Sequence, residues 1–175
     1  MHEAFIEMLQ QRIQTTHSWL IETTESLTEA QLTWIPSSTA PPIRWHLWHT
    51  ARAADLSQAS FSRPASTAPS SQQIWHMQNL AHVWHLEPKQ LGWEEIGAQM
   101  NDHMAATLAL PEKQILLTYV QAVFQRFEQA IAEPRSEWLA PVIDGMGFEL
   151  SHASRHLGMI EALRGVQLLH GTATT

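Results

Sequence analysis

The sequence Ile43-Arg-Trp-His-Leu-Trp-His-Thr-Ala-Arg-Ala-Ala-Asp55 belongs to a run of helix-forming residues that continues to Ala59 without a glycine. Pro42 precedes this run, and proline is favoured in the first turn of a helix, where its missing N–H group costs no hydrogen bond. The run therefore predicts a helix that begins near Pro42 and ends near Phe61.

This helix carries two histidines, and the helical period places them on different sides of Trp45. His49 follows Trp45 by about one turn, so a buried Trp45 would bring His49 onto the same inward face. His46 lies about 60° further round, on the other side of Trp45. We therefore prefer His49 to His46 as a residue of a buried site.

Three more long helices are predicted from apolar residues that recur three and four positions apart. They span residues 2–27, with a break near Ser26 and a short restart, then residues 111–134 and 148–169. Gly145 and Gly147 are expected to loosen the chain before the last of these helices. Shorter helical stretches are predicted over residues 74–86 and 93–108, and loops over residues 36–42 and 62–71.

Four long helices joined by loops, with no alternating strand pattern, indicate an all-α fold. We predict a four-helix bundle with extra short helices between the second and third long helices. The Ser- and Pro-rich segment 62–71 is too short to separate two domains, so residues 1–175 are expected to form a single domain. Helical bundles place their sites between facing helices, so the function depends on which polar residues point inward.

Composition excludes several classes of function. The chain has 175 residues, 44% of them hydrophobic, and a formal net charge of -7 with histidine neutral. That sign opposes binding to a phosphate backbone, so we expect no nucleic-acid partner. No window approaches the roughly 18 consecutive apolar residues of a membrane span, and the N-terminus is amphipathic. We therefore expect no membrane segment and a cytoplasmic protein.

The absence of cysteine restricts the metal chemistry, because any transition metal must then be held by His, Asp or Glu. The segment His152-Ala-Ser-Arg-His156 places two imidazoles on one face of the last predicted helix, where both could bind one ion. This spacing is common in helical metal sites and also arises by chance in a chain with 11 histidines. A third ligand must come from another helix, and His49 is the candidate.

The other histidines have simpler interpretations. His49 itself could be a core histidine bonded to a carbonyl group or to Asp55. A competing cluster of histidines, which we interpret mainly as pocket-lining or solvated, consists of His76, His82 and His85. The remaining histidines, expected to face solvent or to lie at helix ends, are His2, His17, His103 and His170.

Few other residues are candidates for a role in chemistry. No residue stands out as a general base, and the two candidates for that role are Asp55 and Glu149. Most of the tryptophans are expected to be core material, whereas Trp48 and Trp75 flank the histidine groups and could line a pocket.

Two segments together resemble the DinB-like (DinB/YfiT) superfamily. The first is residues 43–55, and the second is Ser151-His-Ala-Ser-Arg-His-Leu-Gly-Met-Ile-Glu-Ala-Leu-Arg-Gly165. Members of that family are four-helix bundles whose second helix carries a Trp-x-x-x-His signature. Their last helix carries His-x-x-x-His followed by Leu-Gly-x-Ile-x-x-Leu-Arg-Gly. Both signatures occur here in the same order.

The resemblance implies a divalent metal ion bound by three imidazoles, which here are His49, His152 and His156, the trio that the spacing also favours. Zinc, nickel, manganese and iron all accept imidazole ligands, and the spacing does not separate them. Family members with known chemistry include transferases and isomerases that use a low-molecular-weight thiol. Residues 75–88 match no relative of known activity, so the substrate stays open.

The expected function is that of a metal-dependent enzyme acting on a small-molecule substrate. The reaction would be thiol-dependent S-transfer or isomerisation of a small electrophile, or metal-assisted hydrolysis, which makes the protein a transferase or a hydrolase. The alternative is a non-catalytic binding or stress-response protein whose histidine site holds a structural ion or none. We also expect a homodimer, since small helical bundles often pair.

Overall fold

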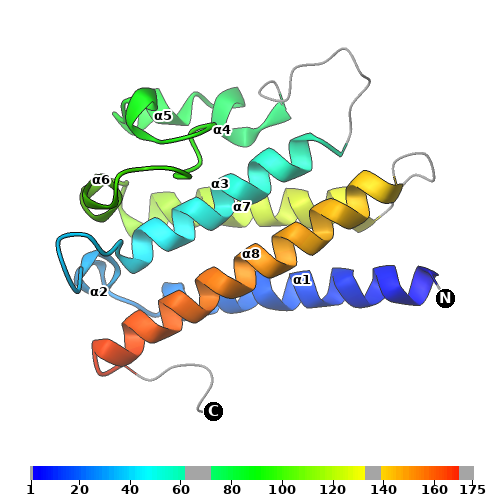
Figure 1. Ribbon diagram of the computed structural model, residues 1–175, viewed down its shortest axis with the longest axis horizontal. Coiled ribbons are helices and arrows are strands. Elements are labelled where there is room, and N and C mark those ends of the chain that lie inside the picture. The colour runs from blue at the N-terminus through cyan, green and yellow to red at the C-terminus, as the bar shows by residue number, and fades with distance from the viewer. Residues whose placement is uncertain (1, 62–71, 133–138, 170–175) are drawn as a thin grey trace.

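The computed structural model describes residues 2–61, 72–132 and 139–169, and over these residues the fold is all-α. Four long helices form a bundle (Figure 1): α1 (His2–Glu25), α3 (Ile43–Ala59), α7 (Lys113–Ala132) and α8 (Leu139–Val166). Helix α3 packs against α7 and α8, and α1 packs against the same two helices. The predicted all-α four-helix bundle is therefore confirmed.

Short helices connect the long ones, as expected between the second and third. Helix α2 (Glu29–Thr33) follows α1, and the others are α4 (Ile74–Met77), α5 (Leu80–Val83), η2 (Pro88–Gln90) and α6 (Asp102–Thr107). In Figure 1 the segment from α4 to α6 lies beside α3 and α7, on the side away from α1. It therefore covers the half of the bundle that contains α3. None of the helices in the described ranges combines the length and the apolar character needed to cross a membrane.

The core follows from the helical period of the apolar residues. Helix α7 shows this most clearly, because its buried residues recur three and four positions apart. They are Leu116, Leu117, Tyr119, Val120, Val123, Phe124, Phe127 and Ile131. The predicted break after the first helix is also present, since α1 ends at Glu25 and Thr28 caps the restart through a capping box with Gln31.

The prediction that Gly145 and Gly147 loosen the chain before the last helix is wrong. Helix α8 begins at Leu139, so both glycines lie inside it. A Cβ atom on Gly145 would overlap the ring of Phe61, which is itself buried just beyond α3. Gly145 therefore allows a close approach between α8 and the end of α3.

The two predicted helical stretches between α3 and α7 are also corrected. Residues 74–86 form two short helices instead of one, because Asn79 adopts a left-handed conformation with φ of 50° between them. Residues 93–108 are helical only in α6, and Trp93 and Ala98 form an isolated antiparallel bridge around a turn. Residues 62–71, predicted to be an exposed loop, lie outside the described residues.

Replacing each of the two glycines by alanine separates close packing from helix propensity. We expect Gly145→Ala to lower the free energy of unfolding by about 1–3 kcal/mol, because the added methyl group overpacks the contact with Phe61. Gly147→Ala is the matched control: no described atom lies within 4 Å of its added Cβ. This control should gain up to about 1 kcal/mol from helix propensity. Urea denaturation followed by circular dichroism measures both, and equal effects would contradict the close packing at Gly145.

Candidate metal centre

Three histidines from two helices meet between α3 and α8. His49 comes from α3, whereas His152 and His156 lie about one turn apart on α8. Each offers one ring nitrogen, and these three nitrogens all lie within 4.8 Å of one another. The Nε2 atoms of His49 and His152 are 3.1 Å apart. The structure thus brings together the three residues that the sequence analysis selected.

The tautomer of His49 is fixed by a backbone carbonyl group. Its Nδ1 atom donates a hydrogen bond to the carbonyl oxygen of Ile96, a group that can only accept. A neutral His49 therefore carries its lone pair on Nε2, the atom that faces His152. The indole ring of Trp45 stacks on this imidazole, with 4.7 Å between the ring centroids. The carbonyl partner, offered above as the simpler interpretation of His49, is thus what aims Nε2 at the other two histidines.

The two histidines of α8 are held in different ways. Nδ1 of His156 lies 3.0 Å from Nδ1 of His46, which comes from α3. His152 stacks on the exposed ring of Phe148, with 5.3 Å between the centroids. The buried Nδ1 atom of His152 has no hydrogen-bond partner among the described residues. His49 and His156 are therefore held through their second ring nitrogen, whereas His152 is held by a ring contact.

Burial keeps these imidazoles neutral. Burial is the largest cause that brings the pKa of His46 and that of His152 down to about 4, and that of His156 down to about 2. Burial also lowers the pKa of His49. The positive charge that a protonated neighbour would carry is the second cause of these low pKa values in His46, His152 and His156. Neutral imidazole is the form that binds metal ions, so few protons would have to be displaced at neutral pH.

The arrangement fits a divalent transition metal ion. Two nitrogens bound at about 2.0–2.1 Å to a tetrahedral ion lie about 3.4 Å apart, close to the 3.1 Å between the Nε2 atoms of His49 and His152. At this distance the lone pair on Nε2 of His49 either accepts a hydrogen bond from Nε2 of His152 or binds a cation that both nitrogens share. A set of three neutral imidazoles suits transition metals better than calcium or magnesium, which prefer oxygen ligands.

A buried ion pair on α3 holds the turn that contains Ile96. The guanidinium group of Arg52 donates hydrogen bonds to the backbone carbonyl oxygens of Glu94 (3.2 Å) and Glu95 (3.0 Å). The same group lies 3.3 Å from the carboxylate of Asp55, and both side chains are fully buried. The turn is therefore tied to the helix that supplies the first histidine of the trio.

Asp55 holds a second stretch of chain. Its carboxylate accepts hydrogen bonds from the backbone N–H groups of Ile74 and Trp75, each at 2.9 Å, and from the hydroxyl of Tyr119 at 3.2 Å. Burial raises the pKa of Tyr119, so this hydroxyl keeps its proton and stays a donor. Asp55, named above as a candidate general base, is thus engaged in holding the fold together.

Gly97 allows the turn to approach the histidines. Its φ of 87° lies in the left-handed region, which favours glycine. A Cβ atom there would lie 2.9 Å from the ring of Trp48, and 3.0 Å from both the ring of Trp45 and Nδ1 of His49. A side chain would push the turn away, and the carbonyl group of Ile96 with it. The only signal in the sequence was a glycine within a stretch that was predicted to be helical.

His17 is buried, so the prediction that it faces solvent or lies at a helix end is wrong. Its Nδ1 lies 2.8 Å from Oε1 of Glu128, its Nε2 lies 3.2 Å from Oε1 of Glu149, and its ring stacks on Phe124. Burial alone would lower the pKa of His17, but the hydrogen bonds and charges of the two carboxylates outweigh it and raise the pKa. Glu149, the other candidate general base, is therefore the buried partner of His17.

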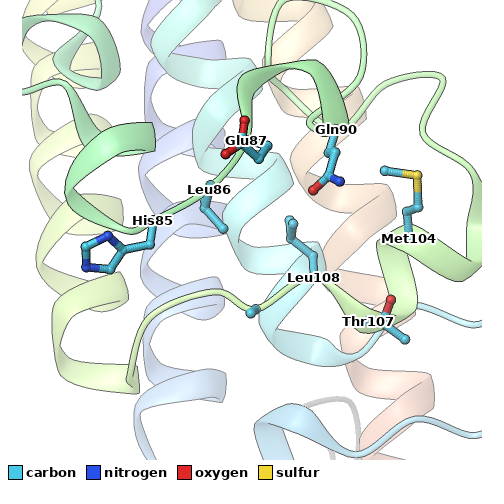
Figure 2. A pocket seen from close by; sticks show the side chains of 8 residues that line it. His85, Leu86, Glu87, Gln90, Met104, Thr107 and Leu108 are labelled. Atoms are coloured by element: carbon cyan, nitrogen blue, oxygen red, sulfur yellow. The ribbon is translucent and has the colours of Figure 1, made fainter.

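The competing histidine cluster does not form a group of potential ligands within the part of the chain that the structure describes. His82 and His85 are exposed, and His76 is half-buried. His85 lines a surface pocket together with Glu87 and Gln90 (Figure 2). The pocket-lining interpretation is therefore correct for His85.

The remaining candidates from the sequence have mixed outcomes. Trp48 and Trp75, which were candidates for lining a pocket, are fully buried and pack against each other with 6.1 Å between ring centroids. His103 is exposed, as predicted. The side chain of His2 and the whole of His170 lie outside the described residues.

Removing the carboxylate of Asp55 tests its structural role. We expect Asp55→Ala to lower the free energy of unfolding by about 3–5 kcal/mol, because it leaves the buried guanidinium of Arg52 without its counter-charge. Asp144→Ala, at an exposed position on α8, is the control and should stay within about 0.5 kcal/mol of the wild type. Urea denaturation measures both values. A loss in Asp55→Ala no larger than in the control would refute the role.

The raised pKa of His17 makes stability depend on pH. Its contribution is complete below the unfolded-state pKa of about 6.5 and is lost as the pH rises through the higher pKa of the folded state. Urea denaturation of metal-free protein at pH values from about 6 to 9 should therefore show a decline that is absent in His17→Gln. The histidines whose pKa is lowered affect stability at acidic pH instead, since their contribution to the free energy of unfolding is lost as the pH falls below about 6.5. An identical decline in His17→Gln would assign the effect to other groups.

Comparison with known proteins agrees with this architecture. The profile of the DinB superfamily matches residues 12–161. A solved structure described as the crystal structure of the conserved protein of locus from Enterococcus faecalis superposes with a TM-score of 0.68. It is 17% identical, with 91% of this chain and 96% of that chain covered, and at this identity it shows the fold alone. No protein with a curated description matches the sequence. Because the family profile spans most of the chain and includes all three histidines of the trio, this protein belongs to the DinB superfamily.

Proposed function

We propose that this protein is a metal-dependent enzyme in which His49, His152 and His156 bind one divalent transition metal ion. The observation that carries the proposal is the convergence of three neutral imidazole nitrogens, within 4.8 Å of one another, from two different helices. A buried cluster of this kind, with no thiolate or carboxylate in it, has little to stabilise it except an ion or an unusual chain of hydrogen bonds.

When bound, a divalent ion held by three neutral ligands would keep its full charge and an open position, and so act as a Lewis acid toward a water or a thiol. The protein's own contribution is orientation. The carbonyl group of Ile96 fixes His49, and Trp45 covers one face of the same ring and excludes water from it. Because the chain contains no cysteine, a thiol nucleophile would have to be supplied as a cosubstrate. We propose S-transfer to, or isomerisation of, a small electrophile, with hydrolysis as the variant.

A structural ion is the second candidate. It is favoured by the burial of two ligands, since His49 is 8% exposed and His156 is 7% exposed. His152 is less buried, and its neighbour Phe148 is 52% exposed, so the third ligand offers the side on which a small molecule could approach. The two candidates differ in whether the ion has a position that an added ligand can reach.

Metal analysis by mass spectrometry on untagged protein tests the site. We expect about one ion per chain in the wild type and loss of the ion in the variant carrying His49→Ala, His152→Ala and His156→Ala. The matched control replaces three histidines outside the group: His82→Ala, His85→Ala and His103→Ala, all exposed. This control should keep the ion. Metal at equal stoichiometry in both triple variants, or its absence from wild type after reconstitution, would refute the proposal.

A second measurement separates the enzyme from the structural ion. Cobalt-loaded wild-type protein should change its visible spectrum when a small thiol is added, if the open position is accessible. An unchanged spectrum at saturating thiol would favour the structural role. Zinc-loaded protein would then be expected to differ from the metal-free form in stability alone.

A further inference from the structure

His46 supports the proposed site from behind one of its ligands. Its Nδ1 atom lies 3.0 Å from Nδ1 of His156, and each of the two side chains is 7% exposed. His46 lies on α3 and His156 on α8, so this contact crosses the same helix interface as the trio. We propose that His46 is a positioning residue that holds His156 in the tautomer with its proton on Nδ1 and its lone pair on Nε2. This inference rests on the proposed function.

The direction of the hydrogen bond follows from the chemistry of imidazole. A bond between two ring nitrogens needs one donor and one acceptor. Because Nδ1 of His156 faces His46, the nitrogen left for an ion is Nε2, and a metal-binding nitrogen carries no proton. The proton of neutral His156 is then on Nδ1, which donates to the lone pair on Nδ1 of His46. His46 carries its own proton on Nε2.

The same arrangement holds the ligand from the opposite helix. Nδ1 of His49 donates to the carbonyl oxygen of Ile96, which leaves its Nε2 free for the site. Orientation of a ligand through its second ring nitrogen is the usual role of groups that surround a metal site. For His156 that group is another imidazole, supplied by the residue one turn before His49.

His46 is not itself a ligand in this scheme. The nitrogens that lie within 4.8 Å of one another belong to His49, His152 and His156. The Nδ1 atom of His46 faces the trio, but it is already hydrogen-bonded to Nδ1 of His156. His46 thus acts through His156, although its sequence position beside Trp45 had placed it outside the preferred site.

Three substitutions at position 46 test the proposal. His46→Asn keeps a polar amide atom near the position of Nδ1, His46→Gln moves the amide one carbon further out, and His46→Leu removes polarity. Zinc affinity is measured by competition with a chromophoric chelator. We expect His46→Leu and His46→Gln to weaken zinc binding about 10–100-fold at unchanged stoichiometry, and His46→Asn to lose much less. His85→Leu, at an exposed position, is the control and should bind like the wild type.

The comparison of Asn with Gln keeps the test decisive if His46→Leu does not fold, because these two variants differ only in reach. Equal zinc affinity in His46→Asn, His46→Gln and wild type would overturn the positioning role. A loss of one bound imidazole in His46→Asn, counted by pulsed electron paramagnetic resonance on the copper-loaded protein, would also overturn it, since His46 would then be a ligand.

Nitrogen-15 NMR of the metal-free protein gives a readout that is independent of the ion. We expect His156 to carry its proton on Nδ1 in wild type and in His46→Asn, and to lose this preference in His46→Gln. A proton on Nε2 of His156 in the wild type would overturn the inference. Failure of the wild type to bind any metal would instead refute the proposed function, while the NMR result would still decide the contact between His46 and His156.

Discussion

The buried ion pair between Arg52 and Asp55 ties two described segments, at residues 74–75 and 94–95, to helix α3. Removing both charges from water is costly, and the pair is tolerable only because backbone groups satisfy the remaining hydrogen-bonding capacity. Arg52 binds two carbonyl oxygens of the turn at residues 94–95, and Asp55 binds two N–H groups at the start of α4. One turn of α3 thus anchors two loop segments, and the segment held by Arg52 brings the carbonyl group of Ile96 to the histidine trio.

The bundle contains two buried histidine environments that shift the pKa in opposite directions. His17 lies between Glu128 and Glu149, which raise its pKa, so an imidazolium is stabilised inside the core. The ring nitrogens of the trio and of His46 make their polar contacts with one another and with the carbonyl oxygen of Ile96, and burial lowers the pKa of each imidazole. Glu149 precedes His152 by three residues on α8. A single helix therefore contributes to one centre that raises the pKa of a histidine and to another that lowers it.

The sequence predicts this fold well where a single helix contains the information. The apolar period identified the long helices, and the spacing of His152 and His156, with the turn between Trp45 and His49, identified three residues that meet. Prediction failed where the cause lies on another element. The contacts of His17 and of His46 depend on residues more than one hundred positions away.

Two of the wrong helix predictions have the same origin. Gly145 was interpreted as a sign of flexibility, because its contact with Phe61 is visible only once α3 and α8 are packed. The turn near residue 95 was predicted to be helical, yet Glu94 and Glu95 adopt φ values of 50° and 56°. Such values are unfavourable for residues with a Cβ atom, and here hydrogen bonds from Arg52 to their carbonyl oxygens hold them in place. Tertiary contacts override local preference at both positions.

Because the trio is shared between two helices, the distance from His49 to the two histidines of α8 can change when the helices move. The separation of His152 and His156 is set by the rigid period of α8 and does not change when that helix moves as a body. The distance to His49 depends on how α8 is seated against α3. A slide by the rise of one residue, about 1.5 Å, is half of the 3.1 Å between the facing Nε2 atoms. A small shift of α8 along α3 would therefore change the distances between the three nitrogens while both helices stay intact.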